Sequence, residues 1–422
     1  MFTFACLRLS RAPLALAAIV LLAAVSRGAD PAAQGFDPVR LQRLDTVIDT
    51  EIQGGRLAGA VMIVKRNGQD VVLKAYGAQD IENAVPMKTD TIFRIASMSK
   101  AVTSIAVMML YEEGRFLLND PVGKFIPEFA RSVVAVPPPP GSPADVKYVT
   151  VPARRSITIR HLLTHTAGLT YGDFAAVEDY KKARLHGWYL IDHDETIGEA
   201  MKRLAQLPLA NQPGEAYDYG YSTDLLGYLV EVVSGQPLDR FVAERISGPL
   251  GMKDTSYYLD PAKAARLAVV YGVEDGRLVR GEDSKRSDFI DGPRKLFSGG
   301  AGLLSTASDY GRLLQMLLNG GELDGVRLLS PRTVELMHRN HTGELYNRDT
   351  GAFGLGFWVN ENPGRLGELV GEGAFGWGSA YFPQYFVDPK EKMIGLMMTQ
   401  LRPTGGSTLN QRFKTTIYQA LK

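Results

Sequence analysis

The most reactive arrangement in this sequence is Ser97-Met98-Ser99-Lys100, a serine followed three residues later by a lysine. A serine hydroxyl is a poor nucleophile until a neighbouring base takes its proton, and a desolvated lysine amine can serve as that base. Residues three apart on a helix lie on one face, so the two side chains come within reach of each other. The spacing predicts nucleophilic catalysis by Ser97, with Lys100 as the base beside it.

A predicted helix positions this pair. An apolar stretch, residues 101–111, follows Lys100 and ends before Gly114, a common helix stop. Ser97 would then lie in the first turn, where free backbone amides and the helix dipole favour developing negative charge. A Ser-x-x-Lys pattern also arises by chance in chains of this length. The motif alone is therefore also compatible with a serine and a lysine that lie on the surface and have no catalytic role.

Sequence patterns that predict β-strands occur near both ends of the chain. Two short apolar runs flank Asn67-Gly68, the strongest short hairpin signal, and residues 381–387 and 393–398 form a second pair of predicted strands. From residue 158 to about residue 318 the pattern is mostly helical. Strands joined by tight turns form antiparallel sheets, so we expect an antiparallel sheet flanked by helices, with a helical part inserted between its two halves.

Length and composition describe an ordinary globular protein. The chain has 422 residues, of which 45% are hydrophobic and 22% charged, enough to bury a core without disulfides or metals. Its 47 lysines and arginines nearly balance 46 aspartates and glutamates. This balance lacks the basic footprint of a nucleic-acid-binding protein, and we expect no nucleic-acid partner.

The first 29 residues, 1–29, predict an export signal. Arg8 and Arg11 precede an apolar run, residues 12–25, that is too short to span a bilayer and is followed by small residues suited to cleavage. The only cysteine, Cys6, would be lost on cleavage, so the mature protein would have no thiol nucleophile. We expect a periplasmic or secreted bacterial protein without stable membrane insertion; an uncleaved anchor is the alternative.

Three longer segments make the pattern specific. Phe93–Ser104, which contains the Ser-x-x-Lys motif, resembles the active-site helix of the class C β-lactamase-like serine hydrolases. Ile157–Leu169 and Pro213–Tyr219 are equally typical of that family. The family includes penicillin-binding proteins, DD-peptidases and family VIII carboxylesterases, and the resemblance extends from about Phe36 to the end of the chain.

The resemblance implies a β-lactamase/transpeptidase-like α/β (α+β) fold, with an antiparallel sheet, flanking helices and an inserted, mostly helical subdomain. We expect one catalytic domain over residues 30–422. Its α/β part would comprise residues 36–114 and 351–422, and the helical insert would comprise residues 115–350. The site would lie at the boundary between them, where concave sites commonly form.

The family's second motif, Tyr-x-Asn, corresponds to Tyr219-Gly220-Tyr221. The resemblance implies that the Tyr219 phenol relays the proton and protonates the leaving group. Tyr221 takes the place of the asparagine beside the substrate, which should weaken recognition of an amide side chain such as that of a β-lactam. Tyr217 or Tyr221 would be the catalytic tyrosine if the register slips.

The third motif, Lys-Thr-Gly, corresponds to Trp377-Gly378-Ser379, similar to the Trp-Gly-Gly version of family VIII esterases. Trp377 replaces a cation that would bind a substrate carboxylate, so the resemblance implies a preference for uncharged acyl esters. Gly378 and Ser379 would line the substrate site with it. By the family pattern, the backbone amides of Ser97 and Ala380 form the oxyanion hole.

Other patterns are weaker. Arg402, just past the last predicted strand, could bind a carboxylate, although a surface arginine is the ordinary interpretation. His161 and His165 have the spacing of zinc ligands without the glutamate of zinc peptidases, so we interpret them as structural. The glycines of residues 371–376 precede a strand rather than the helix of a dinucleotide site, and the glycine-rich residues 297–306 are assigned a structural role. We predict no metal and no cofactor.

Three functions remain open. The favoured one is a serine carboxylesterase acting on short acyl esters. The second is a β-lactamase, a D-aminopeptidase or DD-peptidase-type amidase, or an acyltransferase that uses the same residues on a small-molecule lactam, peptide or ester. The third is a penicillin-binding module that acylates without turnover. The sequence also leaves open the oligomeric state and whether Lys100 or Tyr219 is the base.

Overall fold

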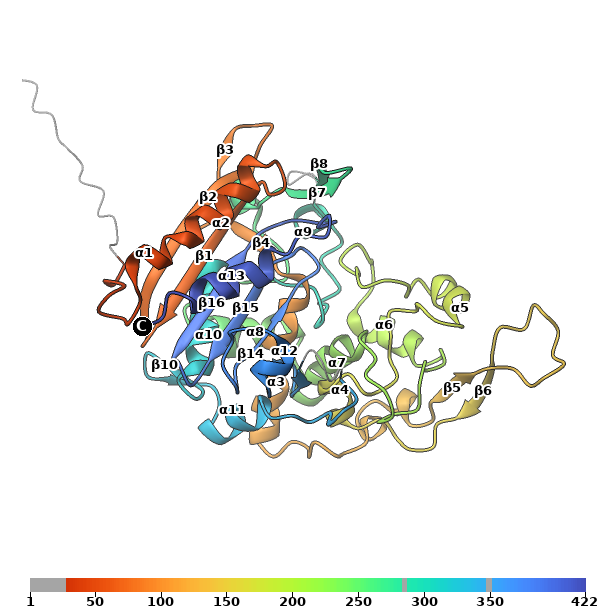
Figure 1. Cartoon of the computed structure of the whole chain (residues 1–422). Helices are drawn as coiled ribbons and strands as arrows, with labels where there is room; N and C mark the ends of the chain where they lie inside the picture. The colour runs from red at the N-terminus through yellow and green to blue at the C-terminus, as the bar shows by residue number, and fades with distance from the viewer. Residues whose placement is uncertain (1–27, 283–286, 347–350) are drawn as a thin grey trace, which may run out of the picture.

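The computed structural model describes residues 28–282, 287–346 and 351–422, and its centre is an 8-stranded sheet (Figure 1). The predicted export signal and Cys6 therefore lie outside the described residues, apart from Gly28 and Ala29. The strand order is β12-β13-β14-β15-β16-β1-β2-β3, with antiparallel pairing throughout. The strands are β1 Gly59–Arg66, β2 Gln69–Asp80, β3 Val85–Pro86, β12 Ala352–Phe353, β13 Trp358–Val359, β14 Phe375–Gly378, β15 Gln384–Asp388 and β16 Met393–Met398.

The two ends of the chain meet in the middle of this sheet. β16 pairs with β1, placing Met398 opposite Val61, and Figure 1 shows the blue C-terminal strands beside the orange N-terminal ones. β1 continues into β2 through Asn67 and Gly68, which have φ values of 52° and 77°. Two consecutive positive φ values are what a tight type I′ hairpin turn requires. The antiparallel sheet expected from the sequence is confirmed.

Helices cover both faces of the sheet. α2 (Arg43–Gln53) and α13 (Leu409–Tyr418) pack against each other, and Met62 of β1 belongs to the same apolar cluster. The next residue of that strand, Ile63, belongs to the cluster on the opposite side, which includes α10 (Ala307–Leu318). Because successive strand side chains point to opposite faces, a strand covered on both faces must be apolar throughout.

The remaining elements lie mostly to one side of the sheet (Figure 1). The helices are α1 Pro38–Leu41, α3 Ser99–Glu112, α4 Ile159–Leu163, α5 Val177–Lys182, α6 Ile197–Leu204, α7 Ser222–Ser234, α8 Leu238–Val242, α9 Asp288–Asp291, α11 Pro331–Met337 and α12 Pro363–Leu366. The short strand pairs are β4 Ile92–Arg94 with β9 Leu304–Thr306, β5 Val133–Val136 with β6 Val149–Pro152, β7 Val270–Glu274 with β8 Arg277–Glu282, and β10 Glu322–Leu323 with β11 Val326–Arg327. No helix among the described residues has the length and hydropathy needed to cross a membrane.

Helix α3 runs between the sheet layer and the helical part. Every residue from Ser99 to Leu110 is buried, and the helix contacts α7. A helix enclosed on all sides is apolar around its whole circumference, which explains why the sequence shows a continuous apolar run here. The chain leaves α3 through Gly114, whose φ of 70° suits a helix end.

The predicted helical insert of residues 115–350 is too wide. α10 falls within that range, yet it packs on β1, β15 and β16 of the sheet. β9 also falls within it and pairs with β4, which precedes α3. The apolar stripe of α10 predicted a helix correctly. The same stripe could not show whether α10 packs on the sheet or within the helical part, because helices in both places bury an apolar stripe.

The first prediction concerns Tyr310, whose buried hydroxyl donates to the Met98 carbonyl at 2.9 Å and so joins α10 to the turn before α3. Tyr310→Phe removes this buried hydrogen bond, and we expect the free energy of unfolding to fall by about 1 kcal/mol in chemical denaturation. Tyr111→Phe is the matched control, because no hydrogen bond of the Tyr111 hydroxyl is found among the described residues. Equal stability of the Tyr310 variant and the unsubstituted protein would contradict this link.

Candidate active site

Ser97 lies in a single 3₁₀ turn, Ala96–Met98, between β4 and α3 rather than in the first α-helical turn that the sequence predicted. Ala96 has a φ of 33°, a left-handed conformation that is costly for a residue with a Cβ. The turn is tied down on one side, where the Ile95 amide donates to the Leu303 carbonyl at 3.1 Å. This constrained backbone places Ser97 on the wall of a cavity of about 380 Å³.

Lys100 lies one turn further on, at the start of α3, and is only 2% exposed. Its Nζ donates to the carbonyl oxygen of Gly300 at 2.9 Å and to the hydroxyl of Tyr171 at 3.1 Å. The same nitrogen lies 4.7 Å from the centroid of the Tyr219 ring. No carboxylate in the described part of the chain forms an ion pair with it, so two neutral groups, a carbonyl and a phenol, hold this amine.

A buried carboxylate fixes the loop that holds Lys100. Asp224, in the first turn of α7, accepts hydrogen bonds from the Ser298 hydroxyl at 2.5 Å and from the Gly300 amide at 3.1 Å. Burial raises the pKa of this carboxyl group. The sequence analysis assigned residues 297–306 a structural role, and in the structure the carbonyl of Gly300 in this loop accepts a hydrogen bond from Lys100. Asp224 itself was missed.

Tyr219 and Trp377 form one wall of the cavity. The Trp377 indole Nε1 donates to the Tyr219 hydroxyl oxygen at 3.2 Å, and the two ring centroids are 5.6 Å apart. An indole N–H can only donate, so the Tyr219 oxygen accepts here and its own proton remains available for a leaving group. His165 also packs on Tyr219, at 4.7 Å between centroids. Burial, together with nearby Lys100, lowers the pKa of His165 well below its usual value and keeps it neutral.

Tyr171 is a site residue that sequence reasoning missed. Its hydroxyl contacts Lys100, and burial raises the pKa of this phenol well above its usual value, so it stays protonated. Tyr171 lies two residues after the family-like segment Ile157–Leu169, so the available signal was proximity to a recognised motif. Lys100 therefore contacts two tyrosines, the hydroxyl of Tyr171 and the ring of Tyr219.

The structure gathers most of the predicted residues around one cavity. Its lining consists of Ser97, Tyr171, Trp188, Tyr219, Trp377, Gly378, Ser379, Ala380 and Arg402. Lys100 adjoins it through Tyr171 and Tyr219. Of the three tyrosines that the sequence offered as candidates, Tyr219 lines the cavity, while Tyr217 packs against Tyr346 and Phe353.

Tyr221, predicted to contact the substrate, does not line the cavity. Its side chain is fully buried, its hydroxyl donates to the Gly187 carbonyl, and its ring packs against Tyr171 at 5.1 Å. The reason is local: α7 begins at Ser222, and the turn into the helix directs Tyr221 into the core. Tyr221 therefore supports the cavity wall from behind.

Ser97 and Ala380, whose amides were predicted to form the oxyanion hole, line this same cavity. β14, which leads into Ala380, contacts the turn Ala96–Met98. The fold thus brings a strand end close to the nucleophile, as an oxyanion hole requires. The role of the two amides stays a prediction.

The histidine pair has structural partners. His161 Nδ1 accepts the amide of Thr158, whose hydroxyl accepts the amide of His161, so the two residues cap α4. The glycines of residues 371–376 lead into β14, as their context predicted. Among the described residues, no group of three or more His, Cys, Asp or Glu is arranged to hold a metal ion.

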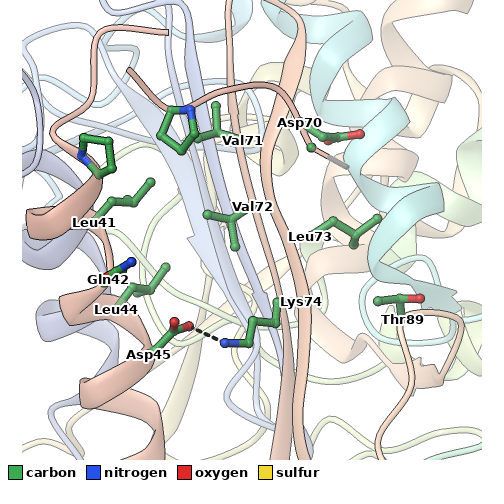
Figure 2. Close-up of a pocket in the computed structure, with 13 residues that line it drawn as sticks. Leu41, Gln42, Leu44, Asp45, Asp70, Val71, Val72, Leu73, Lys74 and Thr89 are labelled. Atoms are coloured by element: carbon green, nitrogen blue, oxygen red, sulfur yellow. Dashed lines mark ion pairs between the residues drawn. The ribbon is translucent and has the colours of Figure 1, made fainter. Parts of the chain in front are cut away.

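A larger cavity, of about 520 Å³, lies between α1, α2 and β2 (Figure 2). Its charged groups engage each other: Lys74 forms an ion pair with Asp45 at 2.9 Å, and the Tyr76 hydroxyl donates to the same carboxylate. No serine, cysteine or histidine is found among the described residues that line it. Its described lining therefore lacks the serine and neighbouring lysine that the sequence predicts for catalysis, and the smaller cavity at Ser97 is the candidate active site.

The second prediction tests how Lys100 is held. A Cβ at residue 300 would lie 2.6 Å from an Asp224 carboxylate oxygen, so Gly300→Ala must displace the loop whose carbonyl binds Lys100. Since a displacement of about 1 Å at a catalytic group can cost about a hundredfold, we expect kcat for an activated ester to fall at least tenfold. Gly364→Ala, in exposed helix α12, is the matched control. A kcat within twofold of the unsubstituted protein would show that this loop does not position Lys100.

Comparison with known proteins agrees with this geometry. The β-lactamase family model matches residues 44–415. Protein Rv1367c of Mycobacterium tuberculosis is 36% identical over 83% of this chain and 87% of its own. Esterase EstB of Burkholderia gladioli is 32% identical over 90% of this chain and 95% of its own. The structure of EstCE1, described as a hydrolase with promiscuous acyltransferase activity, superposes with a TM-score of 0.78 and 26% identity, covering 92% of this chain and 100% of that one. The chain belongs to the β-lactamase family and is a serine hydrolase with the β-lactamase/transpeptidase-like fold.

Proposed function

We propose that this protein is a carboxylesterase that hydrolyses esters of short acyl chains through an acyl-enzyme on Ser97. The observation that carries the proposal is Trp377, which occupies the lysine position of the family's third motif and walls the cavity beside Tyr219. A lysine there would bind a lactam or peptide carboxylate; an indole offers an apolar surface instead. EstB is named as an esterase, which supports the same choice.

The proposed acylation uses the contacts described above. Ser97 Oγ attacks the ester carbonyl carbon and its proton passes to Lys100, while the carbonyl oxygen takes negative charge between the amides of Ser97 and Ala380. The bond to the alcohol then breaks, and Tyr219 donates a proton to the departing oxygen. The Trp377 hydrogen bond to the Tyr219 oxygen supports this donor role, because it leaves the phenol proton free.

Deacylation reverses the proton movements. Water attacks the acyl carbon, gives one proton to the same basic groups, and the acyl–oxygen bond to Ser97 breaks as the serine regains a proton. The products are a carboxylic acid and the free enzyme. At about 380 Å³, with aromatic walls, the cavity lies in the lower part of the range of small-molecule pockets, which favours short acyl chains.

Acyl transfer is the second candidate. If an alcohol replaces water in the second step, the same residues form a new ester. The relative EstCE1 is described as a hydrolase with promiscuous acyltransferase activity, which favours this candidate over β-lactam hydrolysis. Transfer and hydrolysis differ only in the acceptor, so an added alcohol distinguishes them by the product formed.

The third prediction compares p-nitrophenyl butyrate with a chromogenic cephalosporin. We expect kcat/KM for the ester to exceed that for the cephalosporin by about a hundredfold, because the lysine and asparagine that would bind the lactam are replaced by Trp377 and Tyr221. Ser97→Ala should lower kcat for the ester at least a thousandfold. Ser142→Ala, in the exposed loop between β5 and β6, is the matched control and should retain full activity.

Two results would overturn the proposal. Activity retained by Ser97→Ala would remove the nucleophile. Faster turnover of the cephalosporin than of the ester would replace the esterase with a β-lactamase. A single rapid burst of product without turnover on either compound would identify a binding module that acylates and stops.

A further inference from the structure

Arg402 lines the catalytic cavity, whereas the sequence analysis named it as a possible carboxylate ligand but preferred an ordinary surface arginine. It follows β16 at the edge of the site and is exposed to solvent. Its guanidinium carbon lies 5.2 Å from the centroid of the Trp188 ring, and Trp188 lines the same cavity. The cation is therefore stacked on an aromatic surface of the site.

The backbone that leads into Arg402 is anchored. Its own amide donates to the Tyr271 carbonyl at 2.6 Å, and the Leu401 amide donates to the Tyr381 carbonyl at 2.9 Å. Trp188 is held in turn by an edge-on contact with Tyr381, 5.6 Å between centroids. Anchored backbone and a fixed stacking partner reduce the entropy that the arginine loses when it binds a ligand.

The guanidinium lacks an acidic partner within the described residues, and none of the residues lining the cavity is an aspartate or glutamate. The buried carboxylate of Asp224 is already bound by Ser298 and Gly300. The cavity thus combines aromatic walls with the guanidinium of Arg402, and no carboxylate among the described residues lines it, which favours an anionic group of the ligand.

We propose that Arg402 is a specificity residue that binds a carboxylate of the substrate, so the preferred esters carry a free carboxylate in their acyl or alcohol part. This inference rests on the proposed esterase function and names its substrate class. The planar guanidinium fork matches a carboxylate in a two-point contact. The sequence-based expectation of uncharged esters followed from Trp377 alone; the structure places a different cation in the cavity.

The fourth prediction uses two matched pairs of esters. Mono-p-nitrophenyl glutarate and p-nitrophenyl valerate differ by a carboxylate in the acyl part. 4-Acetoxybenzoate and 4-acetoxybenzamide differ by a carboxylate in the leaving group. For each pair the charge preference is kcat/KM of the anionic ester divided by that of the neutral ester. A ratio within one variant cancels any loss of folded protein.

We expect Arg402→Gln to lower the charge preference at least tenfold in one of the two pairs, and that pair identifies which part of the substrate faces Arg402. Arg402→Lys should keep an intermediate preference, since it retains the charge without the fork. Added salt should reduce the preference of the unsubstituted protein. Lys390→Gln is the matched control, because it removes one exposed positive charge at the far end of β16, about 20 Å away along the strand.

If Arg402→Gln changed the charge preference by less than twofold in both pairs, this inference would be overturned. The esterase function would then remain intact. A decrease of the same size in Lys390→Gln would also overturn it, since the effect would then be one of net charge. If the unsubstituted protein hydrolysed none of the four esters, the proposed function would fail, and this inference would fail with it.

Discussion

The buried primary amine of Lys100, which contacts two tyrosines of the cavity that Ser97 lines, is the group on which the rest of the site depends. Taking an amine out of water is costly unless hydrogen bonds replace those it loses. Here the Gly300 carbonyl and the Tyr171 hydroxyl replace them, and the face of the Tyr219 ring covers the amine. Each of these partners must itself be held in position by other residues, so the position of one nitrogen atom depends on contacts further from the site.

That support comes from segments far apart in the sequence. Gly300 is fixed by Asp224 of α7, and the Tyr219 hydroxyl is held by Trp377 of β14. β14 belongs to the sheet that joins the two ends of the chain, whereas α7 belongs to the helical part. The site therefore exists only where these two layers meet, which explains why α3, the helix between them, is buried around its whole circumference.

Local sequence signals predicted those parts of the fold and site that depend on local geometry. The serine–lysine spacing, the Asn67-Gly68 hairpin and the end of α3 at Gly114 each follow from one or two helical or strand turns. Family resemblance then brought Tyr219 and Trp377 to the same site. Neither local patterns nor family resemblance predicted contacts such as that of Asp224 with Gly300. No periodicity connects residues 76 positions apart.

Two errors have the same origin. Tyr221 was expected at the substrate because it follows Tyr219 by two residues, yet the start of α7 directs it into the core. The helical insert was drawn too wide because an amphipathic stripe predicts a helix and does not identify its neighbour. In both cases the tertiary environment decides where a side chain or helix packs, and the sequence pattern alone does not contain it.

The central claim is that Ser97 is the nucleophile activated by Lys100. The most direct test is labelling with a fluorophosphonate, followed by intact-protein mass measurement and peptide mapping. We predict one adduct per molecule, on Ser97, and labelling at least a hundredfold slower in Lys100→Met. An adduct on another residue such as Ser99 with Ser97 unmodified, or an unchanged labelling rate in Lys100→Met, would contradict this account.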